Sequence, residues 1–165
     1  MAKVMGLGAF SSACAPSAVL DGEGPAAGEP VAEASAAIAG ADGNATISAA
    51  NTVVNQYTRL AANAAQNATS LTVTSVAALA AGSDALATGD LVMVVQMQGA
   101  SINTAMDNAT WGSVTALNGA GNYELVEVRA VDTGTNTITL SCALKNAYSA
   151  TGATQVIRVP QYNTL

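Results

Sequence analysis

The sequence contains no histidine, and this absence removes most of the familiar catalytic and metal chemistry. Without histidine there is no Ser–His or Cys–His nucleophilic pair, and the commonest ligand of transition metals is missing. The two cysteines, Cys14 and Cys142, lie far apart in the sequence and do not make up a zinc ligand set. We therefore expect no enzymatic activity, no metal and no cofactor.

Charged and aromatic residues are scarce as well. Five Lys and Arg residues stand against 11 Asp and Glu residues, and the net charge is −6. A chain with so little positive charge lacks the electrostatic footprint that phosphate backbones require, so nucleic acid is not an expected partner. Aromatic residues make up 4% of the chain, so a core must be built from Val, Leu, Ile and Met. No stretch approaches the roughly 20 apolar residues of a membrane-spanning helix.

The first 14 residues have the layout of a bacterial export signal that ends at a cysteine. Lys3 precedes the apolar run Val4–Phe10, and small residues lead from there to Cys14. Such a signal peptide is cut just before a lipid-modified cysteine. The layout predicts a secreted lipoprotein anchored through Cys14, located at the outer-membrane surface of a bacterium or outside the cell. The alternative for this region is an ordinary N-terminus without a signal.

The two cysteines have two possible fates. In an oxidising compartment Cys14 and Cys142 can form a disulfide. Alternatively Cys14 is acylated, and Cys142 remains a small buried apolar residue inside a strand. We favour acylation, because Cys14 lies ahead of a flexible segment and nothing in the sequence holds it near residue 142.

The composition changes at about residue 50. Residues 15–50 are rich in Ala, Gly, Pro and acids and have few large apolar side chains. Such a composition does not bury enough surface to offset the entropy of ordering the chain. We expect residues 1–14 to be the export signal, residues 15–50 an acidic linker, and residues 51–165 a β domain that is compatible with continuing in a longer parent protein.

Short segments with alternating apolar and polar residues, which predict β-strands, follow from residue 51 onward. In the strongest of them, Leu91, Met93, Val95 and Met97 form a wholly apolar face, while the opposite face is apolar only in its first half. This pattern predicts a central strand covered on both sides over that half. The expected strands are 52–58, 71–74, 91–98, 123–131, 137–142 and 155–159, with a hairpin turn at 132–136 and a helical turn near 77–81. Together they predict an all-β fold, a small barrel or sandwich of about six strands.

The connection Gly99–Asn122 is unusually long and rich in Asn, Thr, Ser and Gly. Loops of this length in a compact domain are either functional or disordered. The connection contains Trp111, the only tryptophan, and Asn108, which are our candidates for ligand binding because an exposed indole stacks on sugars or anchors a protein partner. The competing interpretation, which we favour, is that Trp111 folds back and closes one end of an aromatic-poor core.

Three short acidic segments offer oxygen ligands of the kind that calcium prefers. They are Asp42–Gly43–Asn44, Asp107–Asn108 and Asp132–Thr133–Gly134. Asp and Asn beside Gly are also the usual residues of turns, and none of the three repeats at a ligand spacing. We therefore interpret all three as turns.

Two segments resemble a known group of proteins. The sequences GDLVMVVQMQG at Gly89–Gly99 and QVIRVPQY at Gln155–Tyr162 are similar to the leading domain of large secreted surface proteins of myxobacteria and related bacteria. In those proteins such segments precede a long Gly-rich β-repeat region, and some of the proteins are adhesin-like or linked to gliding motility. The resemblance covers residues 51–165, and it implies a surface module without implying any functional residue.

The sequence thus predicts an exported, lipid-anchored structural or adhesive surface module without catalytic activity. One alternative is a carbohydrate-binding module that uses the connection 99–122. Another is a fibre subunit that assembles by strand addition at an exposed edge, either Val53–Tyr57 or Val156–Val159. The expected partners are other surface proteins or glycans, with membrane contact only through the lipid anchor.

Overall fold

The computed structural model describes residues 42–106 and 109–162. The chain divides into two compact units, Met1–Ala32 and Glu33–Leu165, and every described residue belongs to the second. The expected export signal, Cys14 and most of the expected linker lie outside the described residues. In the part of the chain that is described, no helix has the length and apolar character needed to cross a membrane.

The described unit consists of strands joined by loops, which confirms the predicted all-β fold. Helical structure in it is limited to two short 3₁₀ turns, η1 (Ala77–Leu79) and η2 (Ala150–Gly152), of which η1 lies where the sequence predicts a helical turn. The strands are β1 (Tyr57–Arg59), β2 (Ser70–Thr72), β3 (Leu91–Gln96), β4 (Ser101–Ile102), β5 (Val114–Ala116), β6 (Tyr123–Asp132), β7 (Thr137–Leu140) and β8 (Thr154–Val159).

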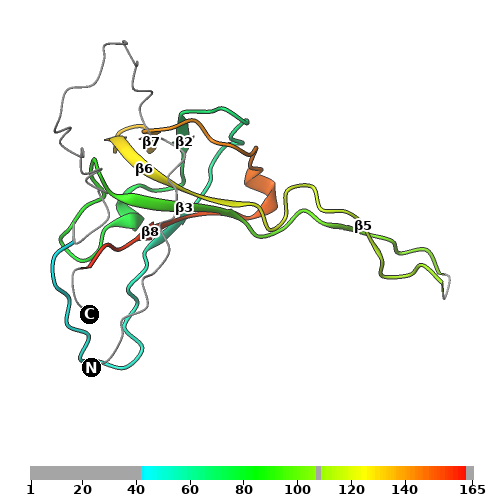
Figure 1. Cartoon of the computed structure of the whole chain (residues 1–165), viewed down its shortest axis with the longest axis horizontal. Coiled ribbons are helices and arrows are strands. Elements are labelled where there is room, and N and C mark those ends of the chain that lie inside the picture. Colours follow the sequence, from blue (N-terminus) through cyan, green and yellow to red (C-terminus); the bar gives the residue numbers. More distant parts are fainter. Residues whose placement is uncertain (1–41, 107–108, 163–165) are drawn as a thin grey trace, which may run out of the picture. The chain divides into compact units, whose positions relative to one another are not determined.

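Six of the strands form one antiparallel sheet in the order β1-β8-β3-β6-β7-β2 (Figure 1). The sheet curls until its two edges meet just beyond β1 and β2, where Leu60 and Val73 form an antiparallel bridge. At this seam the Thr74 N–H donates to the backbone oxygen of Arg59 at 2.8 Å. The predicted small β fold of about six strands is therefore a curled, barrel-like sheet rather than two separate layers.

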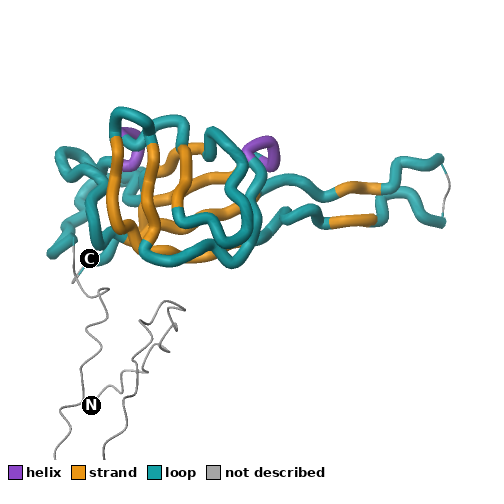
Figure 2. The backbone as a smooth tube through the Cα atoms, turned by 90° about the horizontal axis from the view of Figure 1, so that it is seen from above, coloured by secondary structure: helices purple, strands orange, loops and turns teal. Residues whose placement is uncertain are grey.

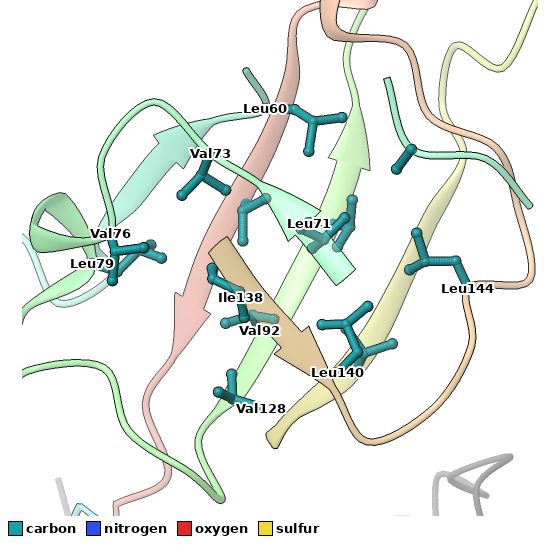
Figure 3. Close-up of a cluster of buried hydrophobic side chains, with 14 of the residues drawn as sticks. Leu60, Leu71, Val73, Val76, Leu79, Val92, Val128, Ile138, Leu140 and Leu144 are labelled. Carbon is teal, nitrogen blue, oxygen red and sulfur yellow. The ribbon is translucent and has the colours of Figure 1, made fainter. Parts of the chain in front are cut away.

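The interior of the barrel is filled by alternate residues of the strands. Val92, Val94 and Gln96 of β3 are buried, whereas the residues between them are half-buried, and β8 repeats this alternation. The inward side chains form one aliphatic cluster in which Tyr148 is the only aromatic member among the described residues. Figure 3 shows ten members of the cluster by name, which are Leu60, Leu71, Val73, Val76, Leu79, Val92, Val128, Ile138, Leu140 and Leu144.

The wholly apolar face of β3 lies on the outside of the barrel. Strand β3 is central, as predicted, because β8 and β6 pair with it on either side. Its outer residues Leu91, Met93 and Val95 are only half-buried, however, and Met97 is exposed. A curled single sheet has one interior, and within the described residues the outer side of β3 is therefore covered only in part.

The expected edge strand Val156–Val159 is not an edge. It belongs to β8, which pairs with β1 on one side and with β3 on the other. Strand addition at this segment, one of the two edges that the fibre hypothesis names, is therefore excluded. The segment Val53–Tyr57 runs into β1, which does lie at the end of the sheet, although the seam at Leu60 closes part of that edge.

The long connection between β3 and β6 forms an arm that projects from the barrel (Figures 1 and 2). We define the arm as residues 99–118, of which 107–108 are not described. Strands β4 and β5 pair antiparallel within it, with a bulge between Ser101 and Ile102. An isolated two-stranded hairpin is marginally stable in water, so the arm depends on its attachment to the barrel.

Replacing Leu71 with alanine tests the position of the core. Leu71 is fully buried, and removing a buried leucine side chain costs about 2–5 kcal/mol of unfolding free energy. Leu117 is exposed on the arm, so Leu117→Ala is a matched control expected to change stability by less than about 0.5 kcal/mol. Urea unfolding followed by circular dichroism measures both variants, and equal losses in the two would contradict this core.

Candidate functional site

Hydrogen bonds of polar side chains hold the arm together. Toward its tip, the Asn103 side chain donates to the Thr110 hydroxyl oxygen at 2.9 Å. At its base, the Asn118 side chain donates to the Gly99 carbonyl oxygen at 3.0 Å and to the Ser101 hydroxyl oxygen at 2.9 Å. Short polar side chains of this kind satisfy the backbone groups that two isolated strands leave open, which accounts for the Asn- and Ser-rich composition of the segment.

The apolar side chains of the arm face solvent. Trp111 is 69% exposed, and Ile102, Met106, Val114 and Leu117 are exposed as well. The connection Gly99–Asn122 contains a single charged residue, Asp107. The described residues of the arm, 99–106 and 109–118, therefore present apolar groups and neutral amides and hydroxyls.

The exposure of Trp111 corrects our favoured interpretation of that residue. Trp111 does not fold back to close the core, because it lies between β4 and β5 on a hairpin that leads away from the barrel. The core contains Tyr148 as its aromatic residue instead. Asn108, the second candidate for ligand binding, lies outside the described residues.

A buried glutamine joins the arm to the barrel. Gln96 is the last residue of β3 and is 1% exposed. Its Nε2 donates to the backbone oxygens of Gln98 at 2.8 Å and Asn118 at 2.9 Å, and its Oε1 accepts from the Ser149 N–H at 2.9 Å. Because both ends of the amide have partners, its burial carries no penalty for an unsatisfied polar group. This one side chain therefore links β3, the base of the arm and the segment before η2.

Glycines make room for this amide. A Cβ atom on Gly152 would lie 2.7 Å from Gln96 Cδ, and one on Gly99 would lie 2.9 Å from Gln96 Nε2. Gly119 has a φ of 83°, which favours glycine, and a Cβ atom there would lie 3.2 Å from the same amide. The sequence marks Gln96 as the polar end of an inner face, but it does not reveal partners that come from distant segments.

An open cleft of about 410 Å³ lies at the base of the arm. Residues from the loop after β1, the turn before β6 and the segment before η2 line it, and none of them is charged. Its polar lining residues are Asn63, Gln96, Asn118, Asn122, Tyr148 and Ser149. The connection 99–122 alone does not reveal this cleft, because four of its six polar lining residues come from other parts of the chain.

Tyr148 belongs both to the cleft wall and to the core. Its hydroxyl is buried and makes no hydrogen bond within the described part of the chain. Burial raises the pKa of Tyr148 far above the usual value, and the nearby Glu124 carboxylate adds to this effect. Glu124 in turn accepts from the backbone N–H groups of Lys145 at 2.9 Å and Asn146 at 3.2 Å. Tyr148 therefore stays neutral at physiological pH.

A buried arginine lies toward the opposite end of β3, where Arg158 of β8 is paired with Val92. Arg158 is 3% exposed, and its Nη2 lies 3.0 Å from Asp42, 2.5 Å from Asp84 and 3.2 Å from Asp90. Burial alone lowers the pKa of Arg158, but the three carboxylates outweigh it and raise that pKa overall. Asp42, which the sequence analysis places in the linker, is thus held against the barrel.

These acids partner an arginine, and their arrangement is not that of a metal site. Within residues 42–106 and 109–162, no group of three or more His, Cys, Asp or Glu residues is placed to hold a metal ion. Asp132, the acid of another expected turn, accepts from the backbone N–H groups of Gly134 at 2.9 Å and Thr135 at 3.2 Å. A hydrogen bond from the Thr135 side chain and, after it, these two backbone hydrogen bonds lower the pKa of Asp132. Asp107–Asn108 lies outside the described residues.

Cys142 differs from its expected role as a free, buried apolar residue. It is half-buried and disulfide-bonded. Strand β7 ends at Leu140, so the inward–outward alternation that points Ile138 and Leu140 into the core does not continue to residue 142. The disulfide alternative of the sequence analysis is therefore favoured over a free Cys142, while Cys14 itself lies outside the described residues.

The ion cluster at Arg158 predicts a large effect of removing the cation. Arg158→Met leaves the carboxylates of Asp42 and Asp90, each 12% exposed, without their positive partner, which costs about 3–5 kcal/mol of unfolding free energy. The matched control is Arg129→Met, at an exposed position of β6, with an expected change below about 0.5 kcal/mol. Chemical unfolding at neutral pH compares the two, and a similar small loss in both would refute the role of Arg158.

The packing around Gln96 predicts that Gly152→Ala loosens the base of the arm. The added methyl group collides with the Gln96 amide, and such overpacking costs about 1–3 kcal/mol. Hydrogen exchange of the Ser149 amide, which donates to Gln96 Oε1, should accelerate in this variant. Gly134→Ala, at the 132–136 turn, is the control, and unchanged Ser149 protection in Gly152→Ala would argue against the network.

No protein-family model matches the sequence, and no curated protein matches it. Solved structures with a similar arrangement include the Gp54 tailspike of Acinetobacter baumannii bacteriophage AP22 in complex with A. baumannii capsular saccharide, with 18% identity and a TM-score of 0.41 over 66% of this chain and 15% of the tailspike. The tailspike gp49 from Pseudomonas phage LKA1 has 20% identity and a TM-score of 0.38, over 63% of this chain and 14% of its own. The tailspike gp61 of Pseudomonas phage phi297 has 20% identity and a TM-score of 0.39, over 66% of this chain and 17% of the tailspike. This chain thus spans less than a fifth of each tailspike, and likeness at this level assigns no function to it.

Proposed function

We propose that this chain is an exported, non-catalytic surface module that binds glycans through its arm. The observation that carries the proposal is the position of the only tryptophan. In a core poor in aromatic residues, Trp111 would contribute more to stability inside than outside, yet it is 69% exposed on the arm. An exposed indole without a structural role is explained by contact with a ligand.

The surroundings of Trp111 favour a neutral, hydroxyl-rich ligand. An indole presents a flat apolar face for the C–H face of a sugar ring, and its N–H remains a hydrogen-bond donor. The neighbouring groups on the arm are amides and hydroxyls such as those of Asn103, Thr110 and Ser113, which both donate and accept. The described part of the arm has no charged residue that would select an anionic partner or a cationic one.

A structural or adhesive module that binds other proteins is the second candidate. Exposed aliphatic residues on the arm, together with the half-covered outer face of β3, favour this function. Protein interfaces are built around such apolar groups. The resemblance of residues 51–165 to bacterial surface proteins is compatible with both candidates.

Export itself rests on the expected signal, and a disulfide at Cys142 is compatible with an oxidising compartment.

Glycan binding is tested by Trp111→Ala on an array of bacterial surface and host glycans. The substitution should weaken binding about tenfold or more, as for other exposed aromatic anchors. Tyr57→Ala is the matched control, because Tyr57 is also an exposed aromatic residue but lies on β1 of the barrel. Unchanged urea unfolding of Trp111→Ala shows that any loss concerns binding and not the fold.

Two results would overturn this proposal. The first is that the wild-type chain binds no glycan on the array. The second is an equal loss of binding in Trp111→Ala and Tyr57→Ala. If light scattering shows concentration-dependent self-association and no glycan on the array is bound, these results would support the protein-binding candidate instead.

A further inference from the structure

We infer that the cleft at the base of the arm is a separate binding site for one neutral saccharide unit. This inference rests on the proposed function for its ligand class, but it uses none of the residues near Trp111. It concerns Asn63, Asn122 and the exposed side of Asn118, which line the cleft together with Ser149.

The cleft contains hydrogen-bonding groups that the fold does not use. The Asn122 side chain makes no hydrogen bond within the described residues, although its backbone N–H donates to Gly119 at 3.0 Å. Asn63 accepts the Ala150 N–H through Oδ1 at 2.9 Å, which leaves its two Nδ2 protons without a protein partner there. Asn118 donates both Nδ2 protons and keeps Oδ1 open. The cleft thus offers donors and acceptors in combination.

The chemistry of these groups selects the ligand. A hydroxyl group both donates and accepts a hydrogen bond, and a carboxamide offers the two complementary functions side by side. No lining residue carries a charge, so neither a phosphate nor an ammonium group would find the partner that its desolvation requires. The lining has no large aliphatic side chain for an apolar ligand. A ring that carries several hydroxyl groups is the ligand class that meets all of these conditions.

The cleft is held in its shape before any ligand binds. Gln96 is one of its lining residues, and the amide of this side chain is fixed by three hydrogen bonds to the backbone. Its rim includes the turn at Asn118 and Gly119, where both residues have positive φ values of 50° and 83°. A site that is already ordered loses little conformational entropy on binding, which favours even a small ligand.

Size and position separate this site from Trp111. A volume of about 410 Å³ is near the lower end of the roughly 300–1,000 Å³ that is usual for ligand sites, which suits a small ligand. The three residues of β5 lie between Trp111 and Asn118 in the chain, and an extended strand of three residues spans about 10 Å. One monosaccharide therefore does not contact both Trp111 and the cleft, whereas a longer glycan has the reach to do so.

Nuclear magnetic resonance of the isotope-labelled full chain tests the inference directly. The probes are the neutral methyl glycosides of glucose, galactose, mannose and N-acetylglucosamine, with glucuronate as an anionic counterpart. At least one neutral glycoside should shift the side-chain amide signals of Asn63 and Asn122. The same shifts should persist in Trp111→Ala, so failure of the cleft and failure of the arm give different results.

Variants of the cleft complete the test. Asn122→Ala removes an amide that the fold does not use, so it should weaken glycoside binding about fivefold, the value of one hydrogen bond, without changing the unfolding curve. Gln56→Ala, a half-buried amide outside the cleft, should bind like the wild type.

Three outcomes would overturn the inference. They are the absence of shifts with every neutral glycoside, shifts confined to the arm, and shifts produced by glucuronate alone. Equal binding by Asn122→Ala and the wild type would likewise remove Asn122 from the site.

Discussion

The side-chain amide of Gln96 is the interaction on which the base of the arm and the cleft beside it depend. It ends the inner face of β3, accepts a hydrogen bond from the segment before η2 and donates one to the turn that closes the arm. A hairpin such as β4–β5 is marginal by itself, so its orientation follows from this anchor. Gln96 also lines the cleft, so the attachment of the arm and the shape of the cleft share one set of hydrogen bonds.

The other end of the barrel contains a buried ion cluster around Arg158. The inward position of Arg158 on β8 buries a positive charge that an aliphatic interior does not tolerate alone. Asp42, Asp84 and Asp90 reach it from three separate places in the chain and neutralise it. Most of the buried charge is thus concentrated at this end. The end that carries the arm is left with neutral groups only along its cleft, which suits recognition of an uncharged ligand.

The barrel and the arm are stabilised in different ways, and this difference affects both proposed binding surfaces. The barrel buries its aliphatic residues and needs no aromatic residue other than Tyr148, which leaves Trp111 outside. The arm gains little from packing and is held by polar side chains, so its apolar groups remain exposed to a partner. A glycan that contacts Trp111 and also places one unit in the cleft would be recognised by shape at one point and by hydrogen bonding at another.

The sequence by itself determined the local properties of this protein. The sequence pattern predicted the six strands of the curled sheet and the hairpin at 132–136, although β1 begins at Tyr57 rather than at residue 52 and the strands β4 and β5 were not predicted. Scarce charge and aromatic residues predicted an aliphatic all-β interior, because these signals lie within a few neighbouring residues. Only the tertiary structure decided which face of β3 points inward, why Val156–Val159 is not an edge and where Trp111 lies. The cleft was also decided there, since Asn63, Asn122 and Ser149 are distant in sequence and meet only because the sheet curls and closes on itself. Alternation specifies that a strand has two faces, but only closure of the barrel specifies which of them is the inside.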